Sequence, residues 1–146
     1  MSIPNISTIM NKVYSTLNVS SVTDMLGTML IGTTTSVPSL FTGNVVSSKA
    51  TRPLLHIHTP SGLQDIGCKN ANGWELNFDI AIMTNEAYSN TTSYGIADGV
   101  LELLHRAPLS ITSHTHLWTE CVGISPALTD KTLSGIVLSF NIAYLN

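Results

Sequence analysis

The segment Trp74–Thr84 reads WELNFDIAIMT, and it is the clearest strand pattern in the chain. Large apolar side chains alternate with polar or smaller ones throughout, and the large apolar set is Trp74, Leu76, Phe78, Ile80 and Ile82. Successive side chains of a strand point to opposite faces of the sheet. The alternation therefore predicts one long strand in a sheet that is covered on one face only.

Other strands are predicted on either side of this stretch. The closing segment Ser134–Leu145, SGIVLSFNIAYL, repeats the alternation, and we expect it to bury the same face. Leu40–Ser47 predicts a short strand that breaks near Gly43, and Arg52–Thr59 predicts a second one opened by Pro53. The segment Leu109–Ser125 is long enough for one or two further strands.

Two helices are expected from apolar spacing. Ile6, Ile9, Met10, Val13 and Leu17 fall on one helical stripe, which predicts a helix over residues 4–17 that Asn18 ends. Ser2 is its expected N-cap. A second stripe, formed by Ile96, Val100, Leu103 and Leu104, predicts a helix that Thr92 or Ser93 caps, that holds His105 and Arg106 in its last turn and that Pro108 stops.

The remaining segments are predicted to be connections. A single turn of helix is expected within VSSVTDMLG, residues 19–27. Thr33–Ser39 is interpreted as a loop, and the Gly- and Asn-rich segment Pro60–Gly73 as a long hairpin loop. Together these elements predict an α+β fold: a single domain over residues 1–146, with an antiparallel or mixed sheet and two main helices packed on one face.

The composition favours a protein that works as part of an assembly. Only 10% of the 146 residues are charged, against about 25% in an average domain. A surface of Ser, Thr and Asn repels its own copies weakly. The net charge is −3, and the six Lys and Arg are scattered singly, which disfavours tight nucleic-acid binding but would let DNA pass by.

Membrane insertion and export are not expected. The chain has no apolar run of 18 residues, and its first residues lack the basic start and apolar core of a signal peptide. Cys68 and Cys121 are too few for a disulfide scaffold or a zinc site made of cysteines alone. We expect two reduced thiols in a protein made inside the cell.

The histidines offer the main alternative to a purely structural role. His56 with His58 and His114 with His116 each have the spacing that places two imidazoles on one face of a strand, as a zinc site could use. Glu120 would share the face of His116 and could orient it, if that strand is regular. The preferred interpretation is polar residues on an outer or subunit-facing surface, whose charging near pH 6.5 could make an assembly sensitive to pH.

Catalytic machinery is not apparent in the sequence. It contains neither the Gly-x-Ser-x-Gly elbow nor a phosphate-binding glycine loop, and the surroundings of the cysteines match no hydrolase signature. Asp98 and Glu102 are interpreted as a solvated helix face, and Gly99 as a point of close approach by the sheet or another chain. We therefore predict no catalytic, cofactor-binding or metal-binding residues and no cofactor.

The order of these segments resembles the tail terminator, or tail completion, proteins of tailed bacteriophages. The resemblance covers roughly Ile6 to Leu145. It is carried by LFTGNVVSSKATRPLLHIHTP, by the strand WELNFDIAIMTNE with its polar exit, by the helix SYGIADGVLELLHRAPLSI, by LWTECVGIS and by the closing TLSGIVLSFNIAY. These are patterns of spacing and hydrophobicity rather than catalytic signatures.

The resemblance implies a non-enzymatic virion protein at the head–tail interface, made in the host cytoplasm. Such a subunit forms a homo-oligomeric ring, commonly a hexamer, that caps the tail tube protein and meets a head-side connector or stopper protein. DNA passes through the lumen only as cargo, and no membrane is involved. We expect the loops Pro60–Gly73 and Asn85–Ser93 to touch these partners.

Two alternatives remain open from the sequence. One is another neck or head-completion protein of the virion, which its position in the particle would distinguish. The other is a small zinc-dependent enzyme that uses the His-x-His pairs, which metal analysis of the purified protein would distinguish.

Overall fold

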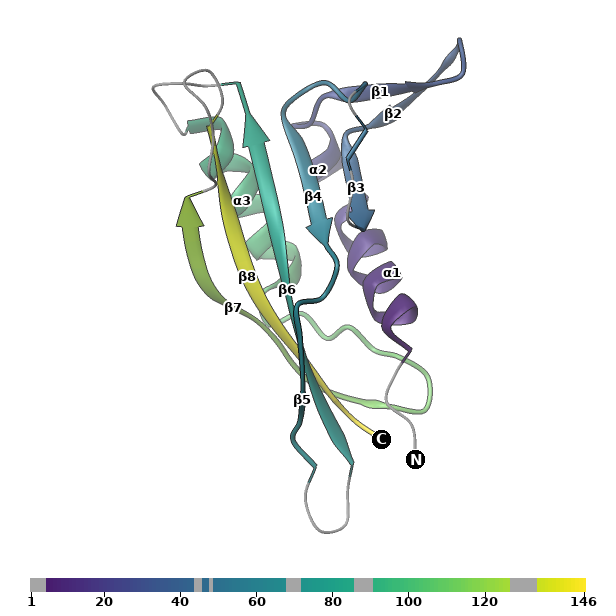
Figure 1. The fold of residues 1–146 in the computed structure, drawn as a ribbon, viewed down its shortest axis with the longest axis vertical. Helices are drawn as coiled ribbons and strands as arrows, with labels where there is room; N and C mark the ends of the chain where they lie inside the picture. The colour runs from purple at the N-terminus through teal and green to yellow at the C-terminus, as the bar shows by residue number, and fades with distance from the viewer. Residues whose placement is uncertain (1–4, 44–45, 48, 68–71, 86–90, 127–133) are drawn as a thin grey trace.

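The structure is a computed structural model that describes residues 5–43, 46–47, 49–67, 72–85, 91–126 and 134–146. The elements follow in the order α1 (Ile6–Leu17), α2 (Ser20–Thr23), β1 (Thr28–Ile31), β2 (Thr35–Pro38), β3 (Leu40–Gly43), β4 (Leu54–His58), β5 (Gly62–Asp65), β6 (Gly73–Thr84), α3 (Thr91–Leu104), β7 (Thr115–Pro126) and β8 (Ser134–Leu145). Figure 1 shows the long strands running the length of the molecule, with helices behind them.

The main sheet has the strand order β3-β4-β6-β8-β7, and β5 pairs with the far end of β6. β3 runs parallel to β4, whereas the other pairs are antiparallel, so the sheet is mixed. β4 and β5 lie one after the other along the same edge of β6. The predicted α+β class with a mixed sheet is confirmed.

The two alternating segments form the centre of this sheet, as predicted. β6 and β8 pair over their full length, from Gly73 opposite Leu145 to Thr84 opposite Ser134. Phe78 lies opposite Phe140, and their rings stack with centroids 5.5 Å apart. The large apolar side chains of β8 are all buried, at Ile136, Leu138, Phe140, Ile142 and Tyr144. Both strands thus present the same apolar face to the core.

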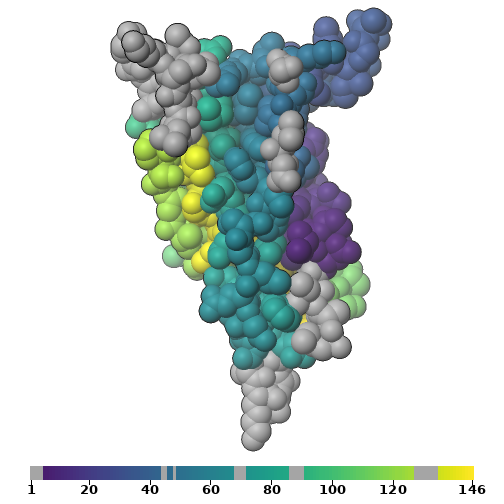
Figure 2. Space-filling view, viewed as in Figure 1, coloured from purple at the N-terminus to yellow at the C-terminus, as the bar shows by residue number. Residues whose placement is uncertain are grey.

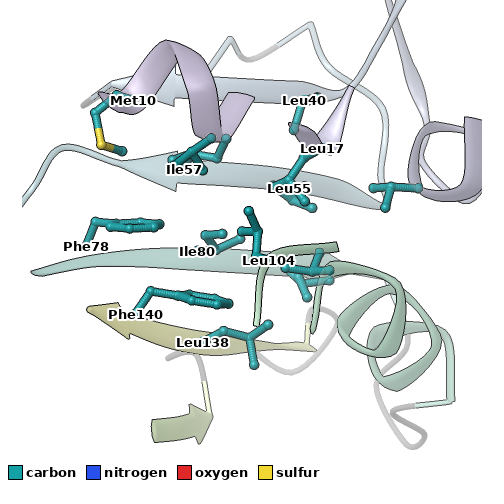
Figure 3. Packing of buried hydrophobic residues seen from close by; sticks show 14 of the residues in the cluster. Met10, Leu17, Leu40, Leu55, Ile57, Phe78, Ile80, Leu104, Leu138 and Phe140 are labelled. Carbon is teal, nitrogen blue, oxygen red and sulfur yellow. The ribbon is translucent and has the colours of Figure 1, made fainter. Parts of the chain in front are cut away.

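The core lies between that face and the helices. Met10 and Leu17 of α1 approach Leu55 and Ile57 of β4, and Leu104 of α3 approaches Ile80 of β6 (Figure 3). α1 contacts α3 and β3, while α3 contacts β6, β7 and β8. The prediction of two main helices on one face is therefore correct.

The helix ends differ in detail from the prediction. α1 is capped by Asn5, whose side-chain oxygen accepts a hydrogen bond from the Ser7 amide at 2.9 Å, and Ser2 lies outside the described residues. Asn18 ends α1, as expected. α3 already includes Thr92 and Ser93, so neither is its N-cap, and the helix ends at Leu104, just before His105.

Two connections proved to be more ordered than the sequence indicated, and one predicted strand region proved to be less so. Thr33–Ser39 is not a loop, because Thr35–Pro38 forms β2 and pairs with β1 around a turn in which Gly32 has a φ of +68°. Within Pro60–Gly73, residues 62–65 form β5. In the segment Leu109–Ser125, a single long strand, β7, begins only at Thr115 and carries two register shifts.

Candidate assembly surfaces

Of the first histidine pair, His56 is buried within the subunit, whereas His58 is partly exposed. His56 and His58 share a face of β4, with ring centroids 4.1 Å apart, as their spacing predicts. However, His56 is only 8% exposed, and Val46, Ser47, Ala50 and Arg52 lie over the same face, where they line a cavity of about 430 Å³ together with both histidines. The His56 Nε2–H donates to the Gly43 carbonyl at 2.6 Å. The expectation of an outer or subunit-facing His56 is therefore wrong.

The second pair does not form a common site. His116 is on β7, where its Nε2 lies 2.7 Å from the Thr119 hydroxyl and its ring meets the edge of Tyr144. His114 precedes the strand and lines a separate hollow beside α1, and its buried Nδ1 has no hydrogen-bond partner. A two-residue spacing places side chains together only within one regular strand, and β7 starts between these two.

Glu120 is not placed to orient His116. A register shift between His116 and Trp118 interrupts the alternation of β7. As a result Thr119, rather than Glu120, faces the same side as His116 and contacts it. Such bulges change the face to which the following side chains point. The sequence pattern of this strand does not predict the position of the bulge.

The fifth histidine meets a cysteine through the backbone. The Cys121 amide donates to Nδ1 of His105 at 3.0 Å, while the free Cys121 thiol points to the Gly123 carbonyl at 3.5 Å. A thiol–imidazole pair, which nucleophilic catalysis needs, is thus not formed here. Cys68 lies outside the described residues. In the part of the chain that the structure describes, no three His, Cys, Asp or Glu side chains come together as metal ligands.

The helix α3 carries the two acidic residues and the glycine noted in the sequence. Asp98 and Glu102 are exposed, as the solvated face predicts. Gly99 packs closely against α2 and the residues just after it. A Cβ at position 99 would lie 3.1 Å from the Met25 methyl group and 3.5 Å from Val22. The close neighbour of Gly99 is therefore α2 of the same subunit, and neither the sheet nor a second chain is needed to explain it.

The loops proposed as partner contacts are only partly described. Residues 68–71 of Pro60–Gly73 and residues 86–90 of Asn85–Ser93 lie outside the described part. The described part of the first loop includes β5, which extends the lower end of the sheet beside β6 (Figure 1). Residues 91–93 of the second belong to α3. The partner role of both loops stays a prediction.

An apolar sheet edge is the first surface that could bind another chain. Among the described strands, β7 pairs with β8 alone. Near Thr119 and Cys121 its outer edge is covered by residues 105–106, because the Arg106 amide donates to Thr119 and His105 accepts from Cys121. Beyond that point Val122 is 57% exposed and Ile124 is 64% exposed. An exposed apolar edge of this kind pairs readily with another chain.

A hollow lies beside this edge. It has a volume of about 400 Å³, and its lining residues come from α3, the turn after it and β7: Leu101, His105, Cys121, Gly123 and Ile124. His105 is the only titratable base in the lining, and no carboxylate belongs to it among the described residues. The surface is thus shallow, apolar and almost uncharged, which are properties of a protein-binding site rather than of a site for ionic ligands.

The β1–β2 hairpin is the second such surface. It stands out from the body of the molecule on the side of β3, and is drawn in blue in Figure 2. Leu30 is 59% exposed and Ile31 is 54% exposed at its tip. No residue from 28 to 38 is charged. The low charge of the sequence suggested a surface that favours assembly, but it did not locate these two apolar patches. Their exposure depends on how the β1–β2 hairpin projects and on the position of β7 at the edge of the sheet.

Comparison with known proteins identifies a similar fold. No protein-family model matches the chain, and no curated protein matches it. Among solved structures, a chain in the virion of a native gene transfer agent particle is similar, with a TM-score of 0.77 and 16% identity. The match covers 99% of this chain and 100% of that one. At this identity the likeness concerns the fold, and it extends from end to end.

None of the described helices combines the length and the hydropathy that crossing a bilayer would require.

Proposed function

We propose that the protein is a structural subunit of a virion and acts through binding rather than catalysis. The observation that carries this proposal is the end-to-end likeness in fold to a chain of a gene transfer agent virion. Two exposed apolar surfaces and a charged fraction of only 10% support it, since such a chain gains by assembling with neighbours. The histidine and cysteine contacts described above offer no catalytic pair.

The finer proposal is a single-domain subunit of a homo-oligomeric ring, commonly a hexamer, at the head–tail interface. The ring would cap the tail tube protein, meet the head-side connector or stopper protein, and let DNA pass through its lumen. The resemblance in the sequence to tail terminator proteins supports this role. The unpaired edge of β7 supports ring formation, because a sheet edge is a natural joint between subunits.

The test is the mass and shape of the purified protein. We expect a cyclic oligomer with a central hole by native mass measurement and negative-stain imaging, and we expect it to bind the ends of isolated tail tubes. A protein that stays monomeric at high concentration and does not bind tubes would contradict the ring and the terminator role together.

The second candidate is another neck or head-completion protein. The similar solved chain is described by its particle, the virion, and this description names no position within it. A density map of the particle separates the two candidates, because a terminator ring contacts the last ring of the tube, whereas a head-completion ring contacts the portal side.

A further inference from the structure

We propose that the β1–β2 hairpin of one subunit packs into the hollow between α3 and β7 of a second copy of the chain. This inference rests on the proposed ring and specifies the contact between its neighbouring subunits. It is drawn from two surfaces that one chain carries at opposite ends of the sheet, a projecting apolar tip and a shallow apolar hollow.

The hairpin is firmly held at its base and free at its tip. Thr51 binds Thr28 through both its amide and its hydroxyl, with hydrogen bonds of 2.8–3.0 Å. The amide of Gly27 donates to Pro53 at 2.7 Å, and that of Ser39 donates to Gly27 at 2.8 Å. A projection with an anchored base is organised before it binds, which lowers the entropy lost on association.

The hollow matches the tip in chemistry. Ile124 and Leu101 provide apolar walls, and the tip provides Leu30 and Ile31. The lining of the hollow and hairpin residues 28–38 include no carboxylate, Lys or Arg among the described residues, and Lys49 is the charged residue that lines a hollow together with Leu30. The free edge of β7 beyond Cys121 runs beside the hollow and can add backbone hydrogen bonds to an incoming strand.

The positions of the two surfaces favour a ring over a two-fold dimer. The hairpin lies next to β3 at one end of the strand order, and β7 is the other end (Figure 1). A contact between different surfaces of identical chains is head-to-tail, and it propagates until the rotation closes a ring. A second copy is therefore favoured over an unrelated partner, because both halves of the contact are present on every subunit.

The hairpin alone is too small to form a stable interface between subunits. A stable interface uses roughly 20–30 residues on each side. The hairpin, residues 28–38, can provide about half of that number on its side. We therefore expect the hairpin and the hollow to form the centre of a larger contact between adjacent sheets. Substitution of Leu30 or Ile124 should weaken this contact more than substitution of its other residues.

Cysteine cross-linking tests the contact directly, because Cys121 already lines the hollow. In a Cys68→Ser background, Leu30→Cys places a second thiol on the hairpin tip. A short bismaleimide should then join neighbouring subunits and give a ladder of covalent oligomers on a denaturing gel, ending at the ring number. The same variant with Cys121→Ser should give no ladder. Ile6→Cys, at an exposed apolar position on α1 that belongs to neither surface, is the matched position control.

A charge placed in the contact provides the second measurement. Ile124→Asp and Leu30→Asp should each shift the native mass from ring to monomer, while the urea unfolding transition of the monomer remains cooperative because both side chains are exposed. Ile6→Asp, also at an exposed apolar position, should leave the ring intact.

The outcomes separate this inference from the proposed function. A ring that gives no ladder from Leu30→Cys or Ile31→Cys, and that survives both Asp variants, would overturn the hairpin contact and leave the ring. A wild-type protein that is monomeric at every concentration would overturn both. A ladder that appears with the Ile6→Cys control as strongly as with Leu30→Cys would show collision between subunits and would count against the inference.

Discussion

His56 and His116 lie in surroundings that favour the neutral imidazole. Burial lowers the pKa of His56, the hydrogen bond to the Gly43 carbonyl raises it, and the neighbouring His58 lowers it. Burial also lowers the pKa of His116, against the effect of a hydrogen bond with the Trp118 backbone. The sequence suggested that pH could act on an assembly, and that stays a prediction. The position of His56 within the subunit indicates that pH acts first on the stability of the fold.

We expect the free energy of unfolding to fall as the pH drops below the ordinary histidine pKa of about 6.5. Both folded-state pKa values lie below the ordinary value of 6.5, so the unfolded chain binds more protons in this range. The loss begins near 6.5 and continues until the folded-state pKa is reached. Urea unfolding at a series of pH values measures it, and a His56→Gln/His116→Gln variant should have a flatter profile. An unchanged slope in that variant would refute the assignment.

Two glycines, Gly135 in β8 and Gly95 in α3, differ in the space around them. A Cβ on Gly135 would clash with the Ile82 carbonyl, whereas a Cβ on Gly95 in α3 would meet nothing within 4 Å. Gly135→Ala should therefore destabilise the fold by about 1–3 kcal/mol through overpacking between β8 and β6. Gly95→Ala should stabilise it by up to about 1 kcal/mol, because Ala is the better helix former. Chemical denaturation of the two variants would contradict this account if they shifted in the same direction.

At the scale of elements, long periodic segments could be predicted and the short polar ones could not. The alternation in β6 and β8 and the stripes of α1 and α3 follow directly from burial of one face. β2 was missed because its Thr- and Ser-rich residues bury no face, and its strand character depends on pairing with β1. The candidate site was missed for a related reason, since the exposure of Leu30 and Ile124 is set by the position of their strands in the sheet, which no local pattern encodes.

The connection from α3 to β7 depends on a tether that can be tested. The buried Tyr144 hydroxyl of β8 donates to the Leu109 carbonyl at 2.6 Å, across 35 residues of sequence. Tyr144→Phe removes the donor and leaves a carbonyl in a buried position without its partner, which should cost about 1–3 kcal/mol. Tyr94→Phe, on the exposed face of α3, should have little effect. Equal stabilities of the two variants by urea unfolding would show that the tether does not hold this connection.

At the scale of the whole molecule, the low charge predicts how an assembly responds to salt. The proposed contact joins the uncharged β1–β2 hairpin to an apolar hollow, so it does not depend on ion pairs. Raising the salt from about 0.1 M to 1 M shortens the screening length from about 10 Å to about 3 Å, which weakens exposed ionic contacts but not apolar ones. We expect the native mass of the ring to stay constant over this range. Ile124→Asp serves as the control that shows the measurement can detect dissociation. A ring that falls apart at high salt while Ile124→Asp leaves it unchanged at low salt would place the subunit contact on charged residues, away from the hairpin and the hollow.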